Sequence, residues 1–353
     1  MWCPAFLAVA LCAMAAAGPA GTIASMQSFK AFRIFSEDGK VQGRLVDATI
    51  DELSAGDVLI KAEYSGVNYK DALAATGAGK IIRKFPLIGG IDAAGTVSSS
   101  TDASSKSGDR VLVTGYDLGV SHDGGYAQYV RAPAKWVVRI PDALTPLDAM
   151  TLGTAGFTAG LAVVRLEQSG LTPAQGKVVV TGATGGVGSS AIAILARLGY
   201  DVTAITGKDE AHEYLTGLGA KAVIDRKTLS MGTRPLEAAT WAGAVDAVGG
   251  DLLAWLTRTM GYWGGIASTG LTGGIDLHTT VMPFILRGVS LIGIDSAMCP
   301  MEIRRNVWQR LATDMKPDRL DTIAKTISFE QLPGAFTTLL DGRARGRYVL
   351  QIN

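Results

Sequence analysis

A glycine-rich turn between a short apolar run and a helical segment carries the clearest chemical signal in this sequence. The run before it, Lys177–Thr181, is apolar and β-branched, which is typical of a buried parallel strand. The segment after it repeats apolar residues at helical spacing from Ile192 to Leu198. The turn itself contains four glycines, at Gly182, Gly185, Gly186 and Gly188.

A strand, a glycine turn and a helix in this order suit a dinucleotide. Missing Cβ atoms let the backbone approach a pyrophosphate, and the helix N-terminus offers unpaired N–H groups and a positive dipole end. In the G-x-G-x-x-G spacing the first position is Ala183, so the match is incomplete, and glycine turns also link ordinary strands and helices. The flanking elements favour a nucleotide site. We expect it to be formed by Thr181, Gly182, Ala183, Thr184, Gly185, Gly186, Val187 and Gly188.

The end of the next strand, Asp201–Ile205, indicates which nicotinamide cofactor is bound. An acidic residue there would bind the 2′-hydroxyl of NAD, whereas a cation accommodates the 2′-phosphate of NADP. This strand is followed by Thr206, Gly207 and Lys208, which supply a hydroxyl and an ammonium group, so we expect NADPH. The alternative is that Lys208 is a solvated surface lysine. Arg226 could add positive charge.

Later strand ends are expected to contact the same cofactor or to be simple turns. These positions are Val248, Gly249, Ser268, Gly270 and Leu271.

Bulk composition narrows the class of protein. The chain has 353 residues, 48% of them hydrophobic and 18% charged, which favours two domains with sizeable cores. The 44 glycines favour an α/β enzyme with many tight turns, and the formal net charge of +1 gives no electrostatic case for nucleic acid. The three cysteines, Cys3, Cys12 and Cys299, show no zinc-binding spacing.

The order of elements predicts a β-rich domain followed by a doubly wound one. Short strands up to about residue 140 suggest a partly open barrel. Beyond Pro141 strands and helices alternate, starting with helical character over Leu144–Leu166 that is interrupted at Leu152–Gly156. This alternation implies a parallel, doubly wound sheet and therefore the α/β class.

Residues 1–25 form an apolar, alanine-rich leader. The stretch resembles a secretory signal, but it lacks a Lys or Arg before the apolar run and is too short for a convincing transmembrane helix. Alternatively, Met26 is the true start. We expect a cytoplasmic enzyme without stable membrane insertion, or an organellar or exported one if the leader is functional.

Several longer runs are specific enough to compare with known families. They are GVNYKDAL, IIRKFPLIGGIDAAG, VTGATGGVG, HEYLTGLGA, WAGAVDAVGG, TTVMPFILRGV and GIDSAM. Together they resemble the medium-chain dehydrogenase/reductase superfamily, most closely the zinc-free quinone-oxidoreductase branch that includes acrylyl-CoA reductases. The resemblance implies a GroES-like catalytic domain at residues 26–146 and an NADPH-binding Rossmann domain at 147–288. Residues 289–353 would form the last Rossmann strand and the return to the catalytic domain.

The resemblance also implies a site without a metal. Zinc alcohol dehydrogenases place a cysteine where Asn68 stands and a His-Glu pair where this chain has Ile91 and Asp92. Asn68 and Tyr69 should therefore face the nicotinamide, Asn68 to orient substrate or ribose and Tyr69 to donate a proton or hydrogen bond. Asn68 could instead only cap a helix, and Tyr69 only fill a wall. Asp92 is expected to support the site. Thr154, Thr158 and Arg347 match positions close to the cofactor.

The implied reaction is hydride transfer from NADPH to the activated double bond of acrylyl-CoA, giving propionyl-CoA. A broader quinone or enone reductase and an NADPH-binding module without turnover are the alternatives. If the substrate is a CoA thioester, its phosphates need cations, for which the candidates are Lys80, Arg83, Lys84, Arg304 and Arg305. Solvated surface clusters are the alternative for these residues.

The apolar run Thr279–Ile294 could supply an edge strand that pairs two chains into a homodimer, or it could be a core strand.

Overall fold

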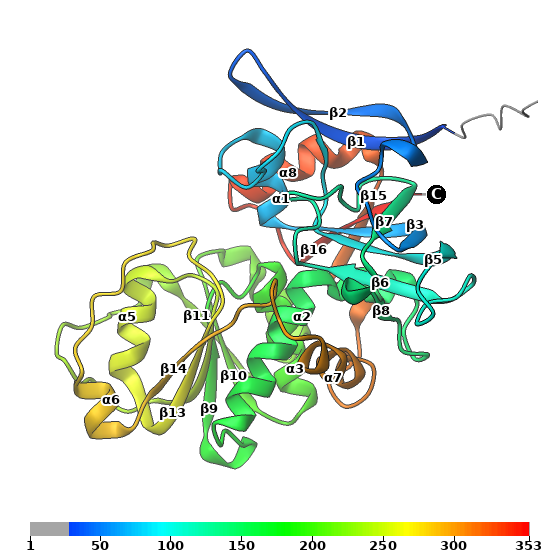
Figure 1. Cartoon of the computed structure of the whole chain (residues 1–353). Helices are drawn as coiled ribbons and strands as arrows, with labels where there is room; N and C mark the ends of the chain where they lie inside the picture. The colour runs from blue at the N-terminus through cyan, green and yellow to red at the C-terminus, as the bar shows by residue number, and fades with distance from the viewer. Residues whose placement is uncertain (1–27, 353) are drawn as a thin grey trace, which may run out of the picture.

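The computed structural model describes residues 28–352, which fold into a β-rich part and an α/β part that meet at a long helix (Figure 1). The predicted leader at residues 1–25 lies outside the described residues. In the first part, β1 (Ser28–Glu37) pairs along its length with β2 (Lys40–Thr49) and at its middle with β4 (Leu87–Ile88).

The larger sheet of this part has seven strands. Its order is β15 (Ala324–Ile327), β16 (Arg347–Gln351), β3 (Val58–Val67), β5 (Asp92–Ser100), β6 (Arg110–Thr114) and β8 (Val138–Arg139), with β7 (Tyr129–Ala132) paired to β3. The last strand of the chain thus pairs antiparallel with β3, where Tyr348 lies opposite Val67. The helices α1 (Tyr69–Thr76) and α8 (Leu332–Leu340) pack on each other in this part.

The second part is a six-stranded parallel sheet. Its order is β11 (Ala222–Asp225), β10 (Asp201–Thr206), β9 (Lys177–Val180), β12 (Trp241–Asp246), β13 (Met260–Ser268) and β14 (Ser290–Gly293). From β9 the chain first adds β10 and β11 on one side of the sheet and then β12, β13 and β14 on the other. This is the doubly wound arrangement expected from the sequence.

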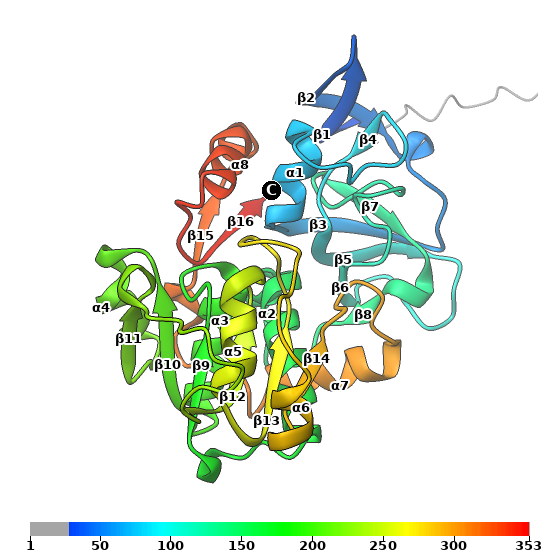
Figure 2. The ribbon, with the colours of Figure 1, turned by 90° about the vertical axis from the view of Figure 1, so that its left-hand side faces the viewer.

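Helices cover both faces of this sheet, as Figure 2 shows. Because side chains alternate along β9, Val178 and Val180 join the core formed with α2 (Pro146–Gln168) and α3 (Gly186–Arg197), whereas Val179 joins the core formed with α5 (Gly250–Thr259). The remaining helices are α4 (His212–Gly217), α6 (Met282–Arg287) and α7 (Met301–Leu311).

Helix α2 connects the two parts and contacts strands of both sheets. By length and composition it could cross a membrane, but 83% of its most apolar stretch is buried inside the protein, as expected of a core helix. Its axis breaks at Gly153, whose φ of 50° and ψ of −155° are not helical. This break falls within the interruption predicted from the sequence at Leu152–Gly156.

Residues 124–128 lie outside regular strands, just before β7. There Gly124 and Gly125 pack directly against the backbone of Gly89 to Asp92.

Candidate active site

The glycine turn between β9 and α3 has the shape of a phosphate cradle. Gly182 has a φ of +58°, which favours glycine, and its carbonyl accepts a 3.0 Å hydrogen bond from the N–H of Gly185. A Cβ on Gly188 would lie 2.4 Å from the carbonyl oxygen of Gly182, so glycine is needed for the helix to start this close to the turn. The turn therefore offers free N–H groups at the start of a 12-residue helix.

Not every residue predicted in this turn presents its side chain. Thr181 is completely buried, and its hydroxyl donates a 2.5 Å hydrogen bond to Oδ1 of Asp246. Asp246 also accepts hydrogen bonds from the N–H groups of Val248 and Gly249. The side chain of Thr181 therefore fixes the ends of β9 and β12 beside the cradle.

Positive charge gathers at the end of β10. The guanidinium nitrogens of Arg226 lie 3.5 Å from the place where a Cβ on Gly207 would be. Lys208 donates a hydrogen bond to the carbonyl of Ala344, and burial lowers its pKa, an effect that the charge of Glu210 opposes. Thr206 accepts a 3.1 Å hydrogen bond from the N–H of Lys208, so this loop is held in a turn around its hydroxyl. A phosphate group would fit this cationic surface.

The remaining predicted strand-end residues lie along the neighbouring strands. Gly249, Ser268, Gly270 and Leu271 line an open cavity of about 330 Å³, while Val248 is buried beside it. Gly270 approaches Ala247 so closely that a Cβ would lie 2.3 Å from its carbonyl oxygen. The cavity therefore opens at the carboxyl ends of β12 and β13, where doubly wound sheets bind their ligands.

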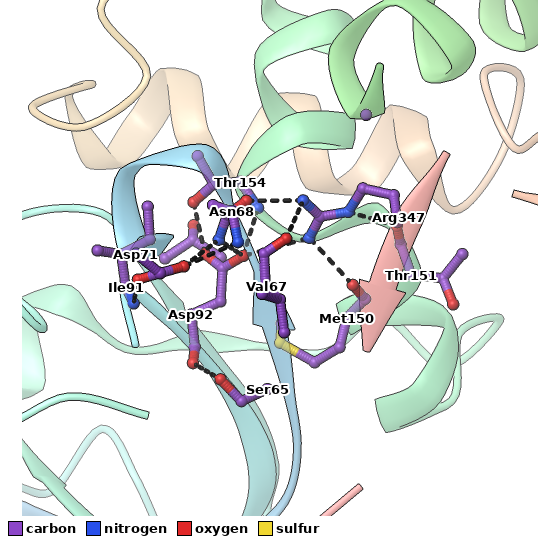
Figure 3. Close-up of polar contacts among 12 residues, drawn as sticks. Ser65, Val67, Asn68, Asp71, Ile91, Asp92, Met150, Thr151, Thr154 and Arg347 are labelled. Atoms are coloured by element: carbon purple, nitrogen blue, oxygen red, sulfur yellow. Dashed lines mark hydrogen bonds and ion pairs between the residues drawn. The ribbon is translucent and has the colours of Figure 1, made fainter. Parts of the chain in front are cut away.

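A buried polar network lies beside the glycine turn and has Asn68 at its centre (Figure 3). The Asn68 amide nitrogen donates to Oδ2 of Asp71 at 3.1 Å and to Oδ2 of Asp92 at 2.9 Å. Its carbonyl oxygen accepts from Nη1 of Arg347 at 2.6 Å. Both donors of the amide are thus used within the protein, and Asn68 holds the site together instead of presenting a free amide to a substrate.

Asp92 and Arg347 form a buried ion pair that glycines make possible. Asp92 is 0% exposed and accepts from the N–H of Thr154 at 2.9 Å, while its Oδ2 lies 3.4 Å from Nη2 of Arg347. A Cβ on Gly66 would lie 2.4 Å from this Oδ2, and one on Gly153 would lie 2.2 Å from Nη2 of Arg347. The break in α2 therefore makes room for the ion pair.

Asp71 is the second carboxylate of the network and was not among the predicted site residues. Oδ2 accepts from the backbone N–H of Asn68 at 2.8 Å, and Oδ1 accepts from the N–H of Ile91 at 2.9 Å. Burial, together with the charge of Asp92, raises the pKa of Asp71 to about 7. Its position, three residues after Asn68 at the start of a helix, is the sequence signal that could have identified it.

The glycine turn and the polar network are joined by the start of β16. The N–H of Gly346 donates to the carbonyl of Thr184 at 2.8 Å, and a Cβ on Gly186 would lie 2.9 Å from Cδ of Arg347. Arg347 thus packs against the glycine turn, and its guanidinium is directed at Asn68 and Asp92 (Figure 3). The guanidinium is therefore not available for a direct contact with a phosphate.

The other predicted residues of the reaction centre differ in accessibility. Tyr69 is the first residue of α1 and is 40% exposed, and its hydroxyl has no partner among residues 28–352. Thr154 donates its hydroxyl hydrogen to Oδ1 of Asp92 and can therefore only accept from a ligand. Thr158 is buried one turn further along and donates to the carbonyl of Thr154.

The five cations proposed for a CoA substrate separate into two groups. Lys80, Arg83, Lys84 and Arg305 are exposed. Arg304 is fully buried: Nη1 donates to the carbonyl and hydroxyl oxygens of Thr114, both at 2.8 Å, and the guanidinium lies over the rings of Tyr116 and Phe157. The prediction that Arg304 binds a phosphate at the cleft mouth is therefore wrong, because its donors hold the two parts of the protein together.

No group of three or more His, Cys, Asp or Glu side chains within the described range could hold a metal ion. At the positions where zinc enzymes place ligands, Asn68 and Asp92 are engaged with each other and with Arg347.

Comparison with known proteins agrees with this architecture. Residues 54–142 match the family described as "Alcohol dehydrogenase GroES-like domain", and residues 186–313 match the one described as "Zinc-binding dehydrogenase". A GroES-like domain with a Rossmann-type dinucleotide domain defines the class of medium-chain dehydrogenases/reductases. The chain belongs to this family, in the branch of the YhdH, YhfP and AcuI proteins.

Three relatives illustrate the similarity. YhfP of Bacillus subtilis, named as a quinone oxidoreductase, is 52% identical over 86% of this chain and 92% of its own length. The acrylyl-CoA reductase AcuI of Ruegeria pomeroyi is 47% identical over 90% of this chain and 96% of its own length. The crystal structure of Escherichia coli YhdH with bound NADPH superposes with a TM-score of 0.89 at 46% identity, covering 92% of this chain and 100% of that one. A structure of YhfP contains NAD.

Proposed function

We propose that the protein reduces the activated C=C bond of acrylyl-CoA to propionyl-CoA with NADPH. The observation that carries this proposal is the pairing of a glycine cradle with a buried, fully hydrogen-bonded polar network at the start of α1, in a chain 47% identical to an acrylyl-CoA reductase. The second candidate is a quinone or broader enone reductase, which the name of the relative at 52% identity favours. A module that binds NADPH without turnover is the third.

The cofactor fits the residues present. The pyrophosphate would be held by the N–H groups of the glycine turn, and the 2′-phosphate by Lys208 and Arg226 beside Gly207. YhfP binds NAD with the same fold, so the choice between cofactors depends on these cations. When bound, NADPH supplies a hydride to the β-carbon of the unsaturated thioester. Gly249, Ser268, Gly270 and Leu271 would line the cofactor site along the strand ends.

The chain's own residues would stabilise the charge that develops during reduction. Negative charge builds on the thioester oxygen as an enolate forms, and oriented donors lower its energy. Tyr69 carries the accessible hydroxyl at this position and would donate to that oxygen or protonate the α-carbon. Asn68 and Asp92 would act as positioning residues, since their polar atoms are engaged in the network.

Binding of a CoA thioester would use the exposed cations Lys80, Arg83, Lys84 and Arg305. Of these, Arg83 makes a long ion pair with Asp117, at 3.6 Å, with its side chain 72% exposed. Such a pair is weak and leaves the guanidinium available to a phosphate.

The protein would form a homodimer through the edge of its parallel sheet. Strand β14 is the edge strand, and large apolar side chains beside it are exposed, including Trp263 at 78%, Ile285 at 72% and Leu291 at 37%. An apolar sheet edge of this kind is suited to pairing with a second copy. We place the enzyme in the cytoplasm, where NADPH is available, and sequencing the N-terminus of the native protein would show whether residues 1–25 are retained.

A substrate panel tests the proposal. NADPH oxidation is measured with acrylyl-CoA, crotonyl-CoA and a quinone under one set of conditions. We expect kcat/KM for acrylyl-CoA to exceed that for the quinone by at least about tenfold, which corresponds to about 1.4 kcal/mol. Turnover of the quinone alone would overturn the thioester proposal, and no turnover with any of the three would support the non-catalytic module.

A further inference from the structure

We propose that Asp71 is a positioning residue whose state of charge controls how firmly Asn68 and Tyr69 are held at the reaction centre. This inference rests on the proposed function, because it concerns the residues that would face the substrate. Asp71 itself is 2% exposed.

The carboxylate of Asp71 fastens the start of α1 to a neighbouring segment. It accepts from both nitrogens of Asn68, at 2.8 Å and 3.1 Å, and from the N–H of Ile91 at 2.9 Å. Ile91 comes directly before Asp92, so Asp71 ties the helix start to the beginning of β5. Hydrogen bonds to a charged carboxylate are roughly twice as strong as those to a neutral acceptor. Ionised Asp71 therefore holds this turn more firmly than protonated Asp71.

The buried charges around Asp71 do not balance when the carboxylates of Asp71 and Asp92 are both ionised. The titratable groups that face it are Asp92 from β5, Arg347 from β16 and Tyr126 from the turn before β7. Helix α8 brings no titratable residue, and β2 meets α1 at its far end, where Val41 packs at Gly77. Two carboxylates thus share one guanidinium in a buried cluster, and protonation of one of them removes the excess charge.

The hydroxyl of Tyr126 is buried and faces this carboxylate. Within residues 28–352 its strongest interaction with a charged group is with Asp71. Burial, followed by the charge of Asp71, raises the pKa of Tyr126 well above its usual range, so the phenol stays neutral beside the carboxylate. Because the pKa of Asp71 is raised to about 7, its carboxyl group gains or loses a proton within the pH range in which enzymes commonly work.

A pH profile of turnover tests the proposal with a matched control. Asp148 is the third residue of α2 and accepts a 3.0 Å hydrogen bond from the N–H of Thr145, as Asp71 does for Asn68, but it lies outside the network. We expect kcat of the wild type and of Asp148→Asn to fall about three- to tenfold as the pH drops from 9 to 6, with KM nearly unchanged. In Asp71→Asn, kcat should not change with pH over this range and should stay at the low value that the wild type has at pH 6. The proposal is overturned if kcat of Asp71→Asn falls with the same midpoint pH as in the wild type, or if kcat of the wild type does not change with pH.

A second measurement needs neither activity nor a folded variant. In the wild-type protein with ¹³C-labelled aspartate carboxyls, one resonance should titrate near pH 7. If every aspartate resonance titrates below pH 6, the proposal is overturned even where turnover is pH dependent. Failure of the proposed function would appear differently, as the titration near pH 7 together with no turnover of any substrate in the panel.

Discussion

The guanidinium of Arg347 donates a 2.6 Å hydrogen bond to the side-chain oxygen of Asn68, across 279 positions of the chain. This contact joins the last strand of the protein to the first turn of α1. It also fixes the orientation of the Asn68 amide, because the oxygen must face the guanidinium and the nitrogen must face the two carboxylates. The glycine turn, which packs against the same arginine, is thereby coupled to the polar network around Asn68.

Replacing Arg347 should destabilise the protein strongly. Arg347→Met leaves Asp92 buried without its ion-pair partner, which costs about 3–5 kcal/mol of unfolding free energy. Chemical denaturation measures this loss. Arg343→Met is the matched control, because its ion pair with Asp341 is exposed at the surface and should contribute less than about 1 kcal/mol. Equal effects of the two substitutions would contradict the role of the buried pair.

Gly153→Ala should disrupt the network through its methyl group. Both Gly153 and Gly170 have positive φ, at 50° and 99°, so alanine is strained at either position. Only at Gly153 would the new Cβ meet Arg347, at 2.2 Å from Nη2, whereas at Gly170 nothing lies within 4 Å. Strain alone costs about 1–2 kcal/mol. We expect Gly153→Ala to lose clearly more stability than Gly170→Ala and to lower kcat as well, as denaturation curves and initial rates would show.

The sequence predicted the architecture because apolar periodicity and glycine turns are local signals. The strand, turn and helix from Lys177 to Leu198 are found where they were expected, and so is the break in α2. The composition of the site could not be predicted fully. The burial of Arg304 depends on Thr114, 190 positions away, and the role of Gly66 depends on Asp92 and Arg347. Contacts of this range leave no periodic pattern in the chain.

Lys208→Ala should change cofactor choice. Removing the ammonium group should raise KM for NADPH by about tenfold or more, since a charge-assisted hydrogen bond to phosphate contributes about 1.5–3 kcal/mol. KM for NADH should change less than about threefold. Lys221→Ala, at an exposed position of the same domain, serves as the control and should affect neither constant. Equal increases for the two cofactors would show that Lys208 does not bind the 2′-phosphate.

The pH dependence of stability should report on Asp71. Its pKa is raised to about 7 in the folded protein from an ordinary value of 3.8, so the folded state binds more protons than the unfolded state between these values. Stability contributed by this group is therefore fully present below about pH 4 and is lost as the pH rises to 7. In Asp71→Asn this position no longer titrates, so the decrease in stability between pH 4 and pH 7 that it causes is absent. Comparing unfolding free energies at pH 5 and pH 8 should show a smaller decrease in the variant by a few kcal/mol; an unchanged decrease would argue against a buried proton.

The dimer should depend on the edge strand of the parallel sheet. Leu291→Lys places a charge on β14 and should convert the dimer to a monomer in light scattering after size exclusion, because edge charges prevent strand pairing. Leu45→Lys, at a comparably exposed position of the other part, should leave the oligomeric state unchanged. A monomeric wild type would refute the proposed assembly outright.

The most direct test of the account follows the hydrogen atoms of the reaction. Acrylyl-CoA is incubated with the protein and NADPH deuterated at C4 of the nicotinamide, and the product is analysed by NMR and mass spectrometry. Hydride transfer to the β-carbon, followed by protonation from solvent at the α-carbon, predicts propionyl-CoA with one deuterium in its methyl group. Recovery of unreduced acrylyl-CoA from a protein that binds NADPH, or oxidation of the cofactor by a quinone alone, would contradict the proposed reaction.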